Sequence, residues 1–342
     1  MKSGMTRRFL TATAVAVTTL FIGGCAQIEK VGTNIALKIF EEKITPKVME
    51  INDVDMACNF SYVNAPLVGA MRAFHGDPSL METVMLSAGG VCSDAKAVQE
   101  ELRYLRASRE KRADEAQDAR IAQKRLLALT AQRQYTAFQR MQTKLEQKYF
   151  FKYGSTCPDF KRDFDELAYL MGTISGLQAM QNDIAAQQSV GVPTDIAPLA
   201  ESALKCLNNA KWWGAPEAGR AIVWSIIPGA GQGRDIKGTF NKSMELAEAK
   251  GVRLSHVMAA MAAQSSDDVA TVREVLTRFT NIQNYTPSEQ YQLIDSIAYD
   301  QMVNISDRLW TQNAGTRTPL GSLGKFWDDK VGGDVNADDF LK

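Results

Sequence analysis

Hydrophobic residues recur at helical spacing along most of the chain. Near the N-terminus they stand three to five positions apart, at Ile28, Val31, Ile35, Ile39, Ile44 and Val48. This spacing predicts an amphipathic helix. The same pattern predicts further helices over residues 159–184, 193–207, 216–227, 240–249, 253–263, 269–279 and 287–310. Alternating runs of Val, Ile and Thr, which are typical of strands, do not interrupt it, so the sequence predicts an all-α fold.

Proline and glycine punctuate this pattern. Pro78 predicts the start of a helix, and Gly89-Gly90 predicts its end. Gly172 and Gly176 instead lie inside a predicted helix, one turn apart. We expect a neighbouring helix to approach closely there, because glycine has no side chain to hold it away.

The middle of the chain allows two interpretations. Neither glycine nor proline occurs between Gly90 and Gly154, and residues 107–118 are almost entirely charged or Ala. Residues 94–152 therefore form either one long helix or two helices that turn within the polar stretch.

Short helices joined by short loops, at a period of about 30–45 residues, are typical of tetratricopeptide-like arrays. We expect residues 53–312 to form one helical-repeat domain of antiparallel helix pairs. The glycine-rich segment 313–342 is expected to be a loosely ordered tail, with Phe326 and Trp327 as docking residues.

The first 25 residues have the pattern of an export signal. A basic start that includes Arg7-Arg8 precedes an apolar run from Phe9 to Ile22. The run is shorter than the roughly 20 residues of a membrane-spanning helix, and it fits the apolar region of a signal peptide. It ends in Ile22-Gly23-Gly24-Cys25, which resembles the lipobox of bacterial lipoproteins. The resemblance implies that residues 1–24 are removed and that the Cys25 thiol carries a diacylglyceryl group.

The residue after the lipobox bears on the location. Ala26 stands where enteric lipoproteins of the inner membrane carry Asp. The resemblance therefore implies the periplasmic face of the outer membrane. Residues 25–52 would form the lipid anchor and a tether helix, and we expect membrane attachment through the lipid alone.

Four cysteines follow the lipobox: Cys58, Cys92, Cys157 and Cys206. In an oxidising compartment an even number predicts two disulfides, with three possible connectivities. We favour Cys58–Cys92 with Cys157–Cys206, because each bond would tie neighbouring helical segments. Buried free thiols are the alternative. Zinc is not expected, since no CxxC or HxxxH spacing occurs.

Charge and composition exclude several classes of function. Lys plus Arg equals Asp plus Glu, at 39 each, so the chain lacks the net basic charge of a nucleic-acid-binding protein. His75 and His256 are the two histidines, and no GxSxG nucleophile motif occurs. The glycine-rich Gly229–Gly233 lacks the Lys-Ser/Thr ending of a phosphate-binding loop. We predict a protein that is not an enzyme and has no cofactor and no metal.

Five segments follow one another at a characteristic spacing: Asp165–Gly176, Asp195–Leu207, Phe240–Ala247, His256–Leu276 and Pro287–Ala298. Together they resemble the T component of tripartite ATP-independent periplasmic (TRAP) transporters, a family of periplasmic lipoproteins with degenerate tetratricopeptide-like repeats. The resemblance implies a homotrimer, an apolar pore or groove through each subunit, and a periplasmic substrate-binding protein of the TRAP type as partner.

Large aromatic and methionine side chains are the candidates for lining such a groove: Trp212, Trp213, Trp224, Met258 and Met261. Such side chains can hold an apolar ligand, but they also form the core of helical repeats. A filled core would favour a different function, that of a tetratricopeptide-like scaffold lipoprotein of an envelope assembly, with no ligand.

Overall fold

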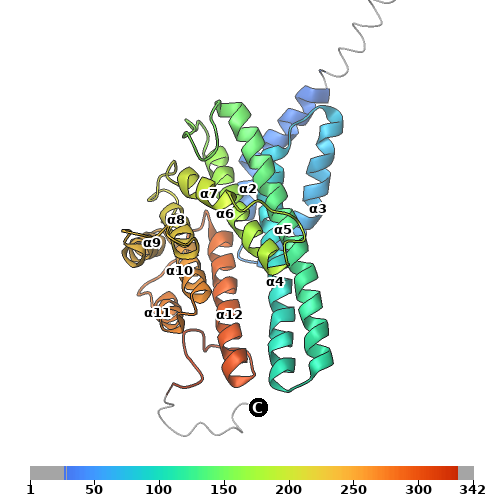
Figure 1. Ribbon diagram of the computed structural model, residues 1–342. Coiled ribbons are helices and arrows are strands. Elements are labelled where there is room, and N and C mark those ends of the chain that lie inside the picture. The colour runs from blue at the N-terminus through green and yellow to red at the C-terminus, as the bar shows by residue number, and fades with distance from the viewer. Residues whose placement is uncertain (1–26, 28, 330–342) are drawn as a thin grey trace, which may run out of the picture.

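The computed structural model describes residue 27 and residues 29–329. Within these residues the chain forms α-helices packed side by side and no strands, so the predicted all-α class is confirmed (Figure 1). The proposed signal peptide, Cys25 and residues 330–342 lie outside the described residues.

After the helical residues 29–39, eleven α-helices, a π-helical turn and a 3-10 turn follow one another in the described part of the chain. They are η1 (Phe40–Ile44), α2 (Thr45–Met49), α3 (Val54–Ala70), η2 (Met71–Phe74), α4 (Ser79–Arg109), α5 (Ala113–Tyr149), α6 (Asp163–Ala185), α7 (Ile196–Leu204), α8 (Ala215–Ile226), α9 (Ile236–Lys250), α10 (Leu254–Ser265), α11 (Val269–Thr280) and α12 (Gln292–Ala314).

The predicted N-terminal helix runs from residue 29 through η1 to the end of α2. Its inner side carries Leu37, which is buried in one cluster with Val68 of α3 and with Met81 and Met85 of α4. This helix therefore packs on the body of the protein along the two helices that follow it.

The longest elements, α4 and α5, form an antiparallel hairpin (Figure 1). Residues 110–112 separate them and lie in the polar stretch 107–118. The structure thus decides between the two interpretations in favour of two helices.

The predicted helix end at Gly89-Gly90 is wrong, because α4 continues through both glycines. A Cβ atom on Gly90 would lie 2.6 Å from Cγ of Gln134 in α5. Glycine costs about 1 kcal/mol relative to alanine inside a helix, and close packing of α4 on α5 offsets that cost. Here glycine serves contact between helices and does not end one.

The close approach predicted at Gly172 and Gly176 is confirmed. A Cβ atom at either position of α6 would lie 2.7 Å from an atom of α5, Cβ of Met141 or Cδ2 of Phe138. A larger side chain at either glycine would therefore push α6 away from α5.

The shorter helices α8 to α11 lie together at the left of Figure 1, and α12 runs beside α4. Asp235 and Asp268 begin α9 and α11, where their carboxylates accept hydrogen bonds from the backbone N–H groups of Gly238 (2.8 Å) and Thr271 (3.0 Å). Such N-caps satisfy backbone donors that the helix itself leaves free.

After α12 the chain folds back on α11. Phe326 is buried, and the guanidinium of Arg273 lies 4.2 Å from its ring centre and 5.4 Å from that of Trp327. Arg273 also pairs with Asp328. These contacts dock the segment that precedes residue 330.

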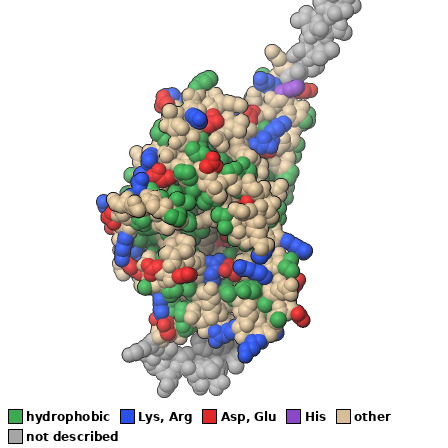
Figure 2. Space-filling view, in the orientation of Figure 1, with side chains coloured by type: hydrophobic (Ala, Val, Ile, Leu, Met, Phe, Trp, Pro, Cys, Tyr) green, Lys and Arg blue, Asp and Glu red, His purple; other side chains and the backbone are tan. Residues whose placement is uncertain are grey.

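The surface mixes charges of both signs. On the face in Figure 2, basic and acidic side chains are interspersed, with hydrophobic side chains between them. Among the helices that the structure describes, none is long and apolar enough to cross a membrane.

Candidate functional site

Two disulfides join the four cysteines in the favoured pairing. Cys58–Cys92 ties α3 to α4, and Cys157–Cys206 ties the segment after α5 to the turn that follows α7. Their Cα atoms lie 5.8 and 5.2 Å apart, within the normal range for a disulfide. Because such bonds persist in oxidising compartments, they indicate an extracytoplasmic location.

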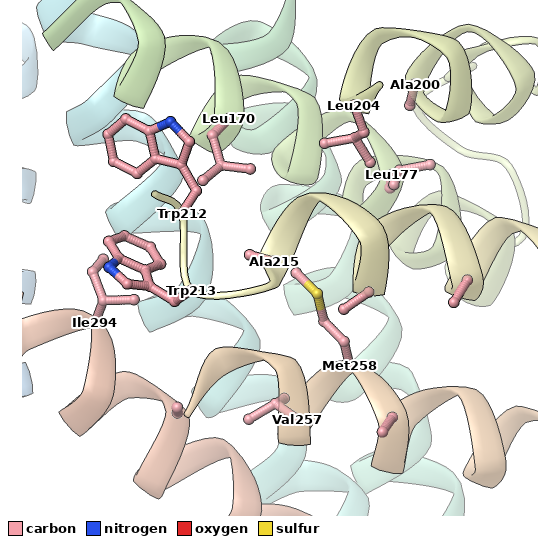
Figure 3. Packing of buried hydrophobic residues seen from close by; sticks show 14 of the residues in the cluster. Leu170, Leu177, Ala200, Leu204, Trp212, Trp213, Ala215, Val257, Met258 and Ile294 are labelled. Carbon is pink, nitrogen blue, oxygen red and sulfur yellow. The ribbon is translucent and has the colours of Figure 1, made fainter. Parts of the chain in front are cut away.

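The structure places four of the five candidate ligand-lining side chains in the main core. Trp212, Trp213, Trp224 and Met258 are all buried there. In Figure 3, Leu170 of α6 lies next to Trp212, Ile294 of α12 lies next to Trp213, and Met258 reaches toward Ala215. The Trp212 and Trp213 rings pack edge to face, with centres 5.5 Å apart.

Two of these three buried tryptophans donate a hydrogen bond from the indole N–H group. The one on Trp212 donates to Glu166 at 2.7 Å, and the one on Trp224 donates to Glu201 at 3.1 Å. These hydrogen bonds hold Trp212 and Trp224, while Trp213 packs against the rings of Trp212 and Tyr291. Met261, the fifth candidate, is partly exposed and lines a small chamber.

The two histidines lie in different settings. His75 is exposed, whereas His256 is buried with Nε2 3.0 Å from Oε1 of Glu248. Arg278 donates to the same oxygen at 2.6 Å. Burial favours a raised pKa for Glu248, but the hydrogen bonds from His256 and Arg278 outweigh it and lower that pKa to about 2. Glu248 of α9 therefore forms an ion pair with Arg278 of α11 and a hydrogen bond with His256 of α10.

In the described part of the chain, no three His, Cys, Asp or Glu residues gather as a potential metal site.

A polar chamber of about 90 Å³ lies among α4, α5, α6, α10 and α12. Half of its lining residues carry side-chain amides: Gln134, Gln178, Gln181, Asn182, Gln264, Gln301 and Asn304. An outer cavity of about 400 Å³ between α3, α4 and α12 has four of the same lining residues, Val91, Asp94, Gln301 and Asn304. The chamber therefore adjoins a wider cleft.

Asp94 carries the unbalanced charge of this chamber. Arg308 also lines it, but its Nε and Nη2 donate to Glu101 at 2.9 and 2.7 Å, and its Nη1 donates to Gln264 at 2.7 Å. Asp94 forms no hydrogen bond or ion pair with another described residue. Burial raises the pKa of Asp94 to about 6, with Arg308 acting against the shift and Glu101 adding to it.

Asp94 is not among the site residues predicted from the sequence, although the sequence carries a signal for it. Val91 stands three residues before it and Val98 four residues after it. This spacing puts all three on one face of a helix. A carboxylate on an apolar helix face is exceptional, because an unpaired buried charge is costly.

Asparagine at position 94 is expected to stabilise the unliganded protein by about 2 kcal/mol at neutral pH. The folded-state pKa of Asp94, about 6, lies above its ordinary value of 3.8. The stabilising contribution of the protonated carboxyl is therefore complete below pH 3.8 and is lost as the pH rises through 6. Urea unfolding of both proteins at pH 4.5 and 7.5 measures the difference.

The matched control is Asp114→Asn, at an exposed position in the first turn of α5. It should change the free energy of unfolding by no more than about 0.5 kcal/mol at either pH. If the difference in stability between wild type and Asp94→Asn were the same at both pH values, Asp94 would not have the raised pKa on which the prediction rests.

An apolar groove of about 250 Å³ lies among α9, α10 and α11. Phe240 and Met244 of α9, Ala259 and Ala263 of α10, and Val275 of α11 line it. Lys237 and Glu274 stand at the same groove, with Nζ and Oε2 3.5 Å apart. None of the tryptophans that were expected to line a groove is among the residues that line this one.

No family model, curated protein or solved structure matches this chain. Its function therefore has to be inferred from its own residues.

Proposed function

We propose that this protein is a lipid-anchored, non-enzymatic protein at the periplasmic face of the outer membrane, where it binds a periplasmic substrate-binding protein of the TRAP type. The lipobox-like segment ending at Cys25 and the two disulfides support the location. A tetratricopeptide-like repeat organisation and a homotrimer are parts of this proposal.

Exposed apolar side chains on the two N-terminal helices support the partner most directly. Val31, Ile35 and Ile39 recur every fourth residue on the outer side of the first helix, and each is about half exposed or more. On the neighbouring α3, Val63 is 69% and Leu67 is 57% exposed. Residues spaced in this way share a helix face, and exposed apolar faces mark interaction sites.

The apolar groove among α9, α10 and α11 supports the apolar ligand of the proposal. Its volume of about 250 Å³ is near the lower end for small-molecule sites. Phe240 and Met244 supply an apolar wall, and the alanines of α10 leave room above the helix backbone.

Light scattering after size exclusion tests the partner proposal. The sample is residues 26–342 without lipid, alone and mixed with a purified TRAP-type substrate-binding protein. We expect a trimer alone and a larger complex in the mixture. The double variant Val63→Glu/Leu67→Glu should lose at least tenfold in affinity for the partner, because it places two charges on the apolar face.

The matched control is Gln132→Glu/Gln139→Glu, which adds two charges at exposed positions of α5. It should bind as the wild type does. The proposal would be wrong if the protein stayed monomeric at all concentrations and formed no complex with the substrate-binding protein.

A scaffold lipoprotein of an envelope assembly, with no ligand, is the second candidate function. The packed core around Trp212 and Trp213 favours it, because neighbouring side chains fill the space where a ligand was expected. This function predicts that the groove stays empty when apolar probes are titrated.

A further inference from the structure

The chamber at Asp94 contains polar groups that the packing of its helices leaves without partners. Gln134 is satisfied, since it donates to Gln178 at 3.3 Å and accepts from Asn182 at 2.9 Å. The side chains of Gln181, Gln301, Asn304 and Asp94 form no hydrogen bond with another described residue. All four residues are partly exposed, so their polar groups face the chamber and the cleft, where they can bind water or a ligand.

The charges around the chamber indicate the sign of that ligand. Glu101 neutralises Arg308, which leaves Asp94 as one negative charge inside. In the adjoining cleft stand Asp55 and Asp300, with Lys96 as the basic residue. Burial, and then the charge of Asp55, raises the pKa of Asp300. Negative charge therefore predominates, which favours a cation over an anion.

The amides indicate what kind of cation fits. A side-chain amide both donates and accepts hydrogen bonds, whereas a hard metal ion needs several oxygen ligands and takes no donor. An ammonium group has three donors to share among a carboxylate and amide oxygens. The amide N–H groups then remain available for hydroxyl or further polar groups of the same molecule.

We propose that the chamber binds the ammonium group of a small polar primary amine. Asp94 accepts one hydrogen bond from the ammonium and balances its charge, while the amide oxygens of Gln301 and Asn304 accept the others. The chamber of about 90 Å³ holds the head group, and the cleft of about 400 Å³ holds the rest of the molecule. This site uses neither the apolar groove nor the apolar face of the N-terminal helices.

Isothermal titration calorimetry on residues 26–342 at pH 7.5 tests the proposal. The probes are ethanolamine and 1,4-diaminobutane, each compared with its neutral diol, ethylene glycol or 1,4-butanediol. We expect at least one amine to bind and neither diol to bind. Asp94→Asn should weaken binding of the amine at least tenfold, and Asp114→Asn should leave its affinity unchanged.

A second variant separates the site from the general charge of the cleft. Gln301→Met keeps the size and every charge but removes an acceptor, so the amine should bind several-fold more weakly. Amines that bind no better than the diols would overturn the proposal. So would an affinity that Asp94→Asn leaves unchanged, or binding at Asp94 of Ca²⁺ alone. Because no partner protein is present, the result is independent of the test of the proposed function.

Discussion

Asp295→Ala is expected to lower the free energy of unfolding by about 3–5 kcal/mol. Asp295 is 3% exposed. Its Oδ1 accepts from the backbone N and Nε of Arg253 at 2.9 and 3.0 Å and from the Tyr285 hydroxyl at 2.6 Å, and its Oδ2 accepts from Nη2 of Arg253 at 2.7 Å. Truncation leaves a buried guanidinium without its counter-charge.

This carboxylate also fixes the arrangement of three segments. Arg253 precedes α10, Tyr285 lies between α11 and α12, and Asp295 is in the first turn of α12. The Arg253 guanidinium lies 4.0 Å from the ring centre of Phe279 and 4.1 Å from that of Tyr285. Loss of the ion pair should therefore loosen the helices around it as well.

Denaturant unfolding of Asp295→Ala measures the effect, with Asp328→Ala as the matched control. Asp328 also pairs with an arginine, Arg273, but it is exposed at the surface. Exposed ion pairs contribute less than about 1 kcal/mol, so the control should change little. Equal losses in the two variants would show that burial does not govern the strength of these pairs.

The second large effect is expected from Cys157→Ser/Cys206→Ser, which should lower the free energy of unfolding by about 2–4 kcal/mol. The bond closes a loop of 49 residues, and in the chain-entropy account it restricts the unfolded chain. It also anchors the segment that leads from α7 to Trp212 and Trp213 in the core.

Denaturant unfolding under oxidising conditions compares this variant with wild type and with Cys58→Ser/Cys92→Ser. A reductant should destabilise the wild type and leave unchanged a variant that lacks all four cysteines. The prediction would be refuted if wild type and Cys157→Ser/Cys206→Ser unfolded at the same denaturant concentration.

The two proposed ligand sites differ in chemistry. The groove among α9, α10 and α11 combines an apolar wall with the paired charges of Lys237 and Glu274, while the chamber at Asp94 concentrates amides around an unpaired carboxylate. An apolar molecule and an amine would therefore bind at separate places and could do so together.

The sequence by itself determined the features that depend on local spacing. Apolar residues at helical intervals specified the all-α class, because only a helix brings them onto one face. Gly172 and Gly176 predicted close contact with another helix, and the cysteines predicted the observed pairing. Local spacing did not settle the role of Gly89-Gly90. Such a pair can end a helix or allow a neighbouring helix to pack closely, and here it allows α5 to pack on α4.

Only the tertiary structure decided features that join distant parts of the chain. It placed the turn between α4 and α5 at residues 110–112 and the tryptophans in a filled core. It also enclosed Asp94 with amides from α5, α6, α10 and α12. The physical reason is that periodicity assigns a residue to a helix face, whereas packing of five helices decides whether that face meets a side chain, water or a cavity.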